Sequence, residues 1–471
     1  MLAEHLVKLI NKNLVHIPTK GQELLIALLA DYIVTNDTGK ILIVKGYAGT
    51  GKTSVIGALV KTLDRLEIKN MLLAPTGRAA KVFSGYSGKN AFTIHRKIYI
   101  QKSSKDAFGS FVLGTNLYSN TIFLVDEASM ISNLGSEDSV FGSGRLLDDL
   151  VKYVKSGDRC KLVLIGDTAQ LPPVGTTLSP ALEKVDMAAY YSEPVDLTLT
   201  EVVRQAEDSG ILVNATIVRN IISTGLIDIP VLKHKNIHGV ESLPSADLAE
   251  TIERSYSRFG REDTVVICRS NKLANKFNKG IRQQVLYFEE EIAAGELLMV
   301  VRNNYFWLNE NPDYDFIANG DIIKIVRILK YCERHGFRFA LVRLLLIDYD
   351  IEFESWILLD ALMSESASLP EADYKRLFYK VLEDYQELKP RKKQIMAVRE
   401  DPFFNALQVK YAYAVTCHKA QGGQWKAVFI DQGYIKKEMI DRDYLRWLYT
   451  AITRATEKLY LVNFPEFFLE V

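Results

Sequence analysis

Short apolar runs alternate with segments of helical spacing along the first part of the chain. The apolar run at residues 41–45 leads into a glycine-rich turn, and residues 54–66 beyond it have apolar positions at helical spacing. The same strand, turn and helix start recur at residues 70–83, and further apolar runs ending in polar residues lie at 121–130 and 161–175. This repeat predicts a parallel α/β sheet.

A second series of this kind occupies the end of the chain. Apolar strands are predicted at 263–270, 410–416, 426–431 and 458–464, with helices at 271–285 and 442–457. In the last helix Leu445, Leu448 and Ile452 form an apolar stripe. At 100 degrees per residue Arg454 lies about 180 degrees from Leu445, so its side chain is predicted to point away from that stripe.

Two stretches interrupt these series. Residues 85–118 contain short aromatic-bearing strands, which predict either a strand-separating wedge or a surface excursion. Residues 291–408 begin with alternating apolar and polar positions and an Asn-Gly-Asp turn at 319–321, and later contain a helix at 368–386. The following segment, 388–399, has five basic residues and no acid, so it is either a phosphate-binding patch or a solvated face.

Composition limits the class of protein. The 471 residues are enough for three or four structural units. Lys plus Arg and Asp plus Glu number 58 each, so any contact with a polyanion must come from a local groove. The four cysteines form no C-x-x-C pair, which favours a reducing compartment and argues against structural zinc.

The chain lacks a stretch long and apolar enough to span a bilayer, and its N-terminus lacks a signal pattern. We therefore expect an intracellular protein with no membrane partner. It would be cytoplasmic, or nuclear or organellar in a eukaryotic cell.

The turn after the first strand has the pattern of a phosphate-binding loop. Its glycines would turn backbone N–H groups toward the phosphates of ATP, while Lys52 reaches the β and γ phosphates and Thr53 ligates Mg²⁺. The alternative is a glycine turn that binds no nucleotide. The predicted nucleotide-binding residues of this loop are Gly46, Ala48, Gly49, Thr50, Gly51, Lys52, Thr53 and Ser54.

Polar residues at later strand ends complete a candidate hydrolytic site. Asp126 would hold Mg²⁺ and Glu127 would activate the attacking water, unless the two are only a solvated acidic pair. Gln170 follows the next strand and could reach the γ phosphate or its water. Arg454 and Arg204 are candidates for an arginine finger, although either could be an ordinary surface arginine.

Eight segments in order resemble motifs I, Ia, Ib, II, III, IV, V and VI of superfamily 1 helicases, closest to the 1B branch that includes RecD-like and Dda-like DNA helicases. They are GYAGTGKTS, APTGRAA, TIHRKIY, LVDEASM, LIGDTAQLPPVG, EVVRQ, VTCHKAQGGQW and LYTAITRA, and they span residues 46–455. The resemblance implies two RecA-like domains that use ATP and Mg²⁺ to move 5′ to 3′ on single-stranded DNA. It also implies that Gln22 contacts adenine.

The resemblance extends to nucleic-acid contacts. Residues at positions that match such contacts, or adjoin them, are Pro75, Thr76, His95, Asn303, Thr416, His418 and Lys419. Each histidine could instead be a structural hydrogen-bonding group. Ala420 stands where the family usually has serine, which makes the DNA contact near motif V less certain, and Tyr47 replaces a usually small residue.

The expected fold is α/β, with two RecA-like P-loop domains of parallel sheets, a small inserted β-hairpin domain, and an inserted β-barrel and helical domain. The expected boundaries are 1–84 and 119–203 for domain 1A, 85–118 for 1B, 204–290 and 409–471 for 2A, and 291–408 for 2B. Domain 2B is expected to contain the small β-barrel that the resemblance implies.

The expected partners are single-stranded and forked or tailed duplex DNA, and replication or repair proteins, for a monomeric motor. Three alternatives stay open: an RNA helicase, a nucleotide-switched scaffold, and a motor subunit of a nuclease complex.

Overall fold

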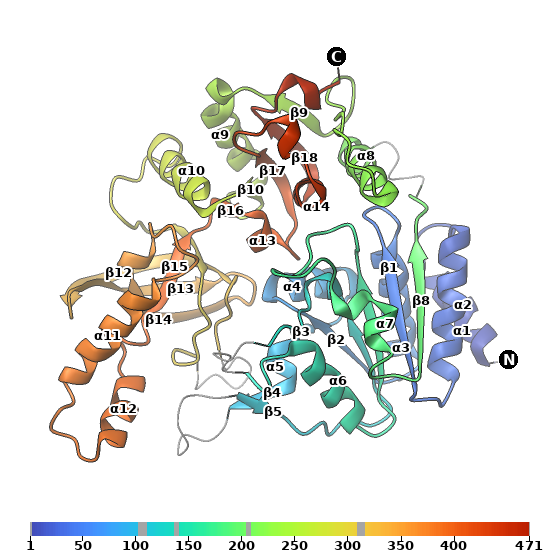
Figure 1. Ribbon diagram of the computed structural model, residues 1–471, viewed down its shortest axis with the longest axis horizontal. Coiled ribbons are helices and arrows are strands. Elements are labelled where there is room, and N and C mark those ends of the chain that lie inside the picture. The colour runs from blue at the N-terminus through green and yellow to red at the C-terminus, as the bar shows by residue number, and fades with distance from the viewer. Residues whose placement is uncertain (1, 102–110, 136–140, 204–208, 309–315, 471) are drawn as a thin grey trace.

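A computed structural model describes residues 2–101, 111–135, 141–203, 209–308 and 316–470 (Figure 1). Two parallel sheets, a closed barrel and a short hairpin make up its strands. None of the helices in these ranges is both long and apolar enough to cross a bilayer.

The first sheet has six parallel strands in the order β3-β2-β6-β7-β1-β8. Their bounds are β1 Lys40–Gly46, β2 Asn70–Ala74, β3 Ala91–Thr93, β6 Ile122–Val125, β7 Lys161–Gly166 and β8 Glu193–Leu199. The associated helices are α1 Leu2–Asn13, α2 Lys20–Val34, α3 Lys52–Arg65, α4 Gly77–Ser87, α5 Ile94–Ile98, α6 Leu146–Ser156 and α7 Lys184–Met187.

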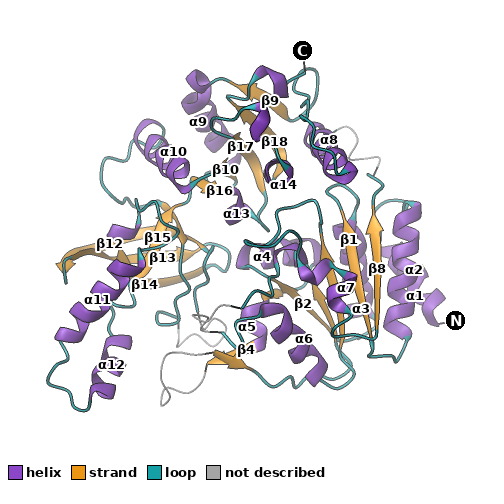
Figure 2. Ribbon diagram, viewed as in Figure 1, coloured by secondary structure: helices purple, strands orange, loops and turns teal. Residues whose placement is uncertain are grey.

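Helices cover both faces of this sheet (Figure 2). Successive side chains of a strand point to opposite faces. Ile41 and Ile43 therefore belong to the core that contains α5 and α6, whereas Leu42 and Val44 belong to the core that contains α2 and α3. The continuous apolar runs seen in the sequence are strands buried on both faces.

The second sheet has five parallel strands in the order β16-β10-β17-β18-β9. Their bounds are β9 Val240–Leu243, β10 Thr264–Cys268, β16 Ala414–Thr416, β17 Trp425–Asp431 and β18 Ala455–Val462. The helices are α8 Gly210–Thr224, α9 Leu248–Phe259, α10 Asn271–Gln284, α13 Cys417–Ala420 and α14 Arg442–Ile452. One face packs with α8 and α14, and the other with α9 and α10.

A closed barrel interrupts this second unit. Its strands are β11 Leu297–Val300, β12 Ile322–Arg334, β13 Phe337–Leu346, β14 Ile351–Leu358 and β15 Leu407–Tyr411. Helices α11 Glu371–Glu383 and α12 Arg391–Arg399 lie beside the barrel, at the lower left of Figure 1. The barrel shares one apolar core with the second sheet, so the two are packed together.

The strand predicted at 410–416 is divided between two sheets. Tyr411 ends β15 in the barrel, and Ala414 begins β16 in the parallel sheet. The barrel thus extends three residues beyond the expected limit of 408. The tyrosine between these strands, Tyr413, is buried and its hydroxyl donates to Glu296 Oε1 at 3.0 Å.

The stretch 85–118 is also divided. β3 pairs with β2 as the edge strand of the first sheet, whereas β4 Tyr99–Gln101 and β5 Phe111–Leu113 form a separate antiparallel pair. The predicted fold class is confirmed, because two parallel sheets flanked by helices, a hairpin and a barrel are all present.

Candidate nucleotide site and nucleic-acid interface

The predicted phosphate-binding loop joins the end of β1 to the start of α3. Gly49 and Gly51 have φ values of 76° and 77°, in the left-handed region that favours glycine. The Lys52 ammonium turns back over the loop, donating to the carbonyls of Gly46 at 2.6 Å and Tyr47 at 2.9 Å. The loop therefore has the backbone shape and the position at a helix N-terminus that suit an anion.

Gln22 lies against this loop and is completely buried. Its Nε2 donates to the Thr50 carbonyl at 3.0 Å, and its Oε1 accepts from the Thr19 N–H at 3.1 Å in the capping box of α2. A Cβ atom at Gly51 would overlap the Gln22 amide. In this conformation Gln22 supports the loop backbone, and its contact with adenine stays a prediction.

The oxygen ligands expected for Mg²⁺ lie near the loop. The Thr53 and Ser54 side chains are exposed in the first turn of α3. Asp126 follows β6, where its Oδ2 accepts from the Tyr86 hydroxyl at 2.6 Å and its Oδ1 accepts from the Glu127 N–H at 2.8 Å. A hydroxyl and a carboxylate fit Mg²⁺, which prefers oxygen ligands and keeps several waters. Tyr86 was not predicted, because it is 40 residues from Asp126 in the chain.

Glu127 is held in an unusual backbone conformation beside Asp126. Its φ is 52°, which is uncommon for a residue other than glycine and is typical of functional sites. Burial raises the pKa of both carboxyls, and the Arg454 guanidinium partly opposes this rise at Glu127. A carboxylate made more basic in this way is suited to accept a proton from water.

Arg454 approaches Glu127 from the second unit. Its Nη1 lies 3.8 Å from Glu127 Oε1, and only 3% of the residue is exposed. The prediction that Arg454 points outward from a helix was wrong, because α14 ends at Ile452 and the Arg454 side chain is buried near Glu127. The side chain is held by the carbonyls of Thr450 at 3.1 Å and Gly423 at 3.3 Å. Arg204, the other candidate finger, lies outside the described residues.

Asp167 and Gln170 lie in the loop after β7, and besides burial the charge of Asp167 contributes to the raised pKa of Glu127. Gln170 is 8% exposed, and its Oε1 has no hydrogen-bond partner among the described residues. Asp167 Oδ2 accepts from the Tyr449 hydroxyl at 2.6 Å, and that hydroxyl accepts from the Ala48 N–H at 2.8 Å. Sequence reasoning missed Tyr449, since on a helical wheel it is one more apolar position of α14.

Several predicted nucleic-acid residues converge on the turn at Asn319, Gly320 and Asp321. The Asn319 N–H donates to Asn303 Oδ1 at 2.6 Å, and Lys419 Nζ donates to Asn319 Oδ1 at 2.5 Å. A Cβ at Gly77, the residue after Pro75 and Thr76, would lie 2.6 Å from Asp321 Oδ1. The turn therefore joins the barrel to both sheet-containing units.

The other predicted nucleic-acid residues lie at the starts of helices or in a separate aromatic cluster. The Thr76 hydroxyl caps α4 by accepting from the Ala79 N–H at 3.2 Å. Thr416 precedes α13, and His418 is exposed on that helix. His95 lies in a separate aromatic cluster, with its ring 4.8 Å from that of Phe141. Burial lowers the pKa of His95 to about 4, so its ring is neutral at physiological pH.

A basic groove of about 800 Å³ lies at the carboxyl ends of β10 and β17. Its cations include Lys272, Lys276 and Lys279, and the ring of Tyr434 beside them is 77% exposed. Single-stranded nucleic acid is bound by such combinations of phosphate-binding cations and exposed aromatic rings. Sequence reasoning missed this groove. The spacing of the three lysines at i, i+4 and i+7 puts them on one helix face and could have indicated it. The residues that line the groove are Arg269, Ser270, Lys272, Leu273, Asn275, Lys276, Lys279, Met363, Gln432, Gly433 and Tyr434.

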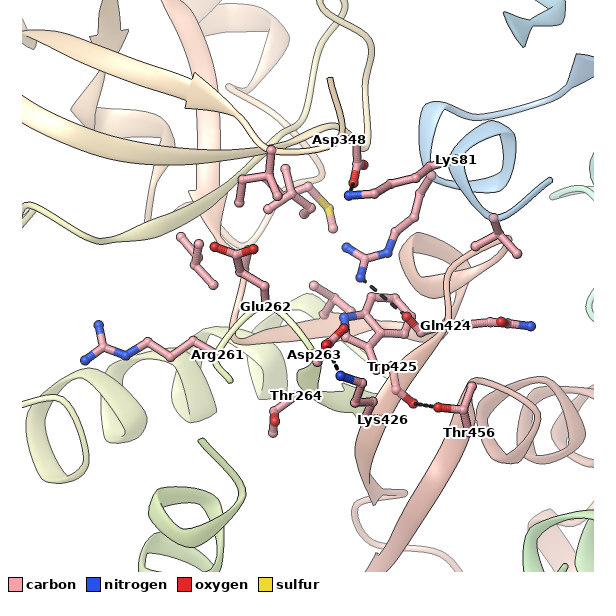
Figure 3. A pocket seen from close by; sticks show the side chains of 18 residues that line it. Lys81, Arg261, Glu262, Asp263, Thr264, Asp348, Gln424, Trp425, Lys426 and Thr456 are labelled. Carbon is pink, nitrogen blue, oxygen red and sulfur yellow. Dashed lines mark hydrogen bonds and ion pairs between the residues drawn. The ribbon is translucent and has the colours of Figure 1, made fainter. Parts of the chain in front are cut away.

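A second cavity, of about 460 Å³, lies where the two sheet-containing units meet the barrel (Figure 3). Lys81 of α4 pairs with Asp348 of the barrel unit at 2.9 Å. The Arg78 guanidinium lies over the Trp425 ring, 4.1 Å from its centroid. Helix α4 therefore contacts both other units through cationic side chains.

Two family models match the chain. An AAA domain matches residues 29–220, and a UvrD-like helicase C-terminal domain matches residues 411–462. The first contains the phosphate-binding loop, Glu127 and Gln170, and the second contains Arg454.

The chain is similar to three proteins and covers a different share of each. "Uncharacterized protein R530" of Acanthamoeba polyphaga mimivirus is 23% identical over 93% of this chain and 98% of its own length. The "ATP-dependent RecD2 DNA helicase" of Deinococcus radiodurans is 30% identical over 37% of this chain and 21% of its own length. The "ATP-dependent DNA helicase dda" of Enterobacteria phage T4 is 24% identical over 60% of this chain and 62% of its own length. The chain thus spans less than two thirds of each of the two named helicases.

Among solved structures, a Pif1 helicase from Bacteroides in complex with ADP-AlF3 and single-stranded DNA is 14% identical, with a TM-score of 0.46 over 97% of this chain and 95% of that chain. A likeness at this level carries no conclusion about the chain.

Proposed function

Because the chain belongs to the 1B branch of the superfamily 1 helicases, we propose that it hydrolyses ATP to move along single-stranded DNA from 5′ to 3′ and to separate duplex strands. The observation that carries this proposal is the contact of Arg454 with Glu127 at 3.8 Å, beside the loop that contains Lys52. Candidate hydrolytic groups of the two units are thus in contact. Nucleotide binding between them can therefore be coupled to movement of one unit against the other.

The residues of the candidate site have separate roles in the proposed reaction. Lys52 and the loop N–H groups bind the phosphates, and Thr53 and Asp126 would hold Mg²⁺, which neutralises phosphate charge. Glu127 orients a water molecule and accepts its proton. Gln170, whose buried Oε1 has no hydrogen-bond partner in the described ranges, positions that water or a phosphate oxygen. Arg454 stabilises the negative charge that develops on the transferred group.

The nucleic-acid path is proposed to follow the turn at 319–321 and the basic groove on α10. Lys419 donates to Asn319 of the turn, Gly77 lies against Asp321 directly after Pro75 and Thr76, and the exposed Tyr434 provides a stacking surface in the groove. The overall balance of 58 basic and 58 acidic residues supports a local site, since the cations of this groove are gathered on one helix face.

The division into domains is part of the proposal. Residues 1–84 and 119–203 form 1A with the nucleotide loop, and 204–290 and the part of 409–471 beyond β15 form 2A with Arg454. Residues 85–118, apart from the edge strand β3 of the first sheet, form 1B, and 291–408 form 2B together with the end of β15 at Tyr411. The pair β4 and β5 of 1B is proposed to act as the wedge that separates strands.

The test is the steady-state ATPase rate without nucleic acid, with single-stranded DNA, and with RNA of matched sequence. Salt is held constant, because phosphate contacts depend on it. Lys52→Ala serves as the control. It is expected to keep the fold, as judged by circular dichroism, and to retain less than about a tenth of the rate, since it removes the phosphate-binding ammonium.

Strong stimulation by DNA supports the proposal and leads to unwinding assays on substrates with 5′ or 3′ tails. Stimulation by RNA alone would contradict the proposed DNA helicase and indicate an RNA helicase. Indifference to both polymers would contradict an autonomous motor and favour a nucleotide switch or a subunit of a nuclease complex. Unwinding from a 3′ tail alone would overturn the proposed direction.

A further inference from the structure

Tyr449 connects the phosphate-binding loop to the segment that carries Arg454. It lies in α14 of the second unit and is completely buried. Its hydroxyl accepts from the Ala48 N–H at 2.8 Å and donates to Asp167 Oδ2 at 2.6 Å. One hydroxyl thus links the loop after β1, the loop after β7 and α14.

The hydroxyl is suited to both bonds at once. Burial raises the pKa of Tyr449 well above its usual value, so the oxygen keeps its proton and still has a lone pair to accept with. The Ala48 N–H is partly buried and the Asp167 carboxylate is buried, so leaving either without a partner would be costly. In this structure Tyr449 satisfies the Ala48 N–H and provides one of the donors to Asp167, whose Oδ1 also accepts from the Ala169 N–H at 2.9 Å.

The Ala48 N–H also belongs to the loop whose backbone donors are proposed to bind phosphate. A phosphate oxygen and the Tyr449 oxygen therefore compete for the same donor. Arg454 lies five residues beyond Tyr449, and its Nε donates to the carbonyl of Thr450, the residue after Tyr449, at 3.1 Å. A movement of Tyr449 would therefore shift the adjacent Thr450 carbonyl, which holds the Arg454 side chain.

We propose that Tyr449 is a positioning residue that holds the Ala48 N–H in the absence of nucleotide and releases it to phosphate, so that nucleotide binding is linked to the position of α14 and Arg454. This inference rests on the proposed function, because it requires that the loop bind ATP. Beyond that function, it assigns a role to a tyrosine that contacts the loop from the opposite unit.

The test compares Tyr449→Phe with Tyr444→Phe in the full chain. Tyr444 is a matched control, because it is a buried tyrosine of the same helix whose hydroxyl donates to Gln432, within its own unit. Binding of a fluorescent ATP analogue with Mg²⁺ is measured by titration, and thermal unfolding is followed in parallel. Removal of the competing hydrogen bond is expected to tighten nucleotide binding by about two- to tenfold in Tyr449→Phe and to leave Tyr444→Phe at the wild-type affinity.

Equal affinity in Tyr449→Phe, Tyr444→Phe and wild type would overturn the inference and leave Tyr449 as a packing residue, even if Tyr449→Phe melts at a lower temperature. Failure of the wild type to bind the analogue in a Lys52-dependent manner would instead overturn the proposed function. If Tyr449→Phe does not fold, amide hydrogen exchange of the wild type decides. Exchange in α14 is expected to change when a non-hydrolysable ATP analogue binds, and unchanged exchange there contradicts the linkage.

Discussion

The Arg454 guanidinium lies 3.8 Å from the Glu127 carboxylate, and the two residues come from different sheet-containing units. Both side chains are largely withdrawn from solvent, with exposed fractions of 4% and 21%. A charge contact of this kind is weakly screened by salt, because little water lies around it. The environment of Glu127 in the first unit therefore depends on the position of the second unit, which carries Arg454.

Replacing Arg454 with alanine is expected to lower the turnover number for ATP by about 10³-fold, as the loss of an arginine finger does, while nucleotide binding is retained. Arg454→Lys should recover only part of the rate, because an ammonium keeps the charge but lacks the planar fork of guanidinium. Steady-state ATPase assays with saturating DNA, together with nucleotide titrations, measure both effects. A normal turnover number in Arg454→Ala would make this side chain a structural arginine.

Neutralising the three lysines of α10 is expected to weaken binding to single-stranded DNA. Lys272→Ala, Lys276→Ala and Lys279→Ala combined should also flatten the dependence of log K on log salt, by about 0.7 for each phosphate that the variant no longer binds. Fluorescence anisotropy at several salt concentrations measures both quantities. The matched control is the triple alanine variant of Lys8, Lys12 and Lys61, exposed cations of α1 and α3. An equal effect in the two variants would indicate a general charge effect and contradict a specific groove.

Asp321 is expected to make the folded chain less stable as pH rises. Burial raises the pKa of this carboxyl from 3.8 to about 7, with a further contribution from Asp348. Between these values the folded state holds a proton that the unfolded state has released, so the free energy of unfolding falls as pH rises from about 4 to 7. Three pKa units correspond to about 4 kcal/mol at most.

Asp321→Asn should therefore raise the melting temperature at pH 8 and have little effect near pH 4. The amide can still accept from the Ala318 N–H, as Asp321 Oδ2 does at 2.7 Å. Asp360→Asn is the control, because Asp360 pairs with the half-exposed Arg338 at 3.4 Å and should not stabilise the chain when replaced. If the melting temperature of Asp321→Asn depends on pH as that of the wild type does, the Asp321 carboxyl is not the source of the pH dependence.

The stacking of Arg78 on Trp425 is expected to stabilise the packing of the first unit against the second. Arg78→Ala should lower the free energy of unfolding by about 1–2 kcal/mol, since it removes a desolvated cation–π interaction. Arg78→Lys should retain part of this stabilisation, because the lysine ammonium is still attracted to the Trp425 ring. Denaturant titration measures the change. Nucleotide affinity is the internal control. It should stay unchanged, because Arg78 lines the cavity beside the barrel and not the phosphate-binding loop.

Local features of the candidate site could be predicted from the sequence. The left-handed conformations of Gly49 and Gly51 depend on residue type and near neighbours, and the apolar run before Asp126 predicts a buried strand ending in carboxylates. The predicted motifs therefore recovered the loop, the acidic pair and Gln170 in their places after β1, β6 and β7.

Other features depended on which distant segments meet. The Tyr449 hydroxyl bonds to the Ala48 N–H across 401 positions of the chain and to Asp167 across 282. Neither residue type nor periodicity predicts such a contact. The division of 410–416 between the barrel and a parallel sheet was likewise invisible, because one apolar run fits either partner.

By itself, the sequence determined the order of the elements and the chemistry at their ends, because backbone preferences and apolar periodicity act over a few residues. The tertiary structure alone decided that Arg454 turns inward to Glu127 and that Tyr449 reaches the loop. Side-chain direction beyond the end of a helix is set by the packing of the two units against each other, and that packing is a property of the whole fold.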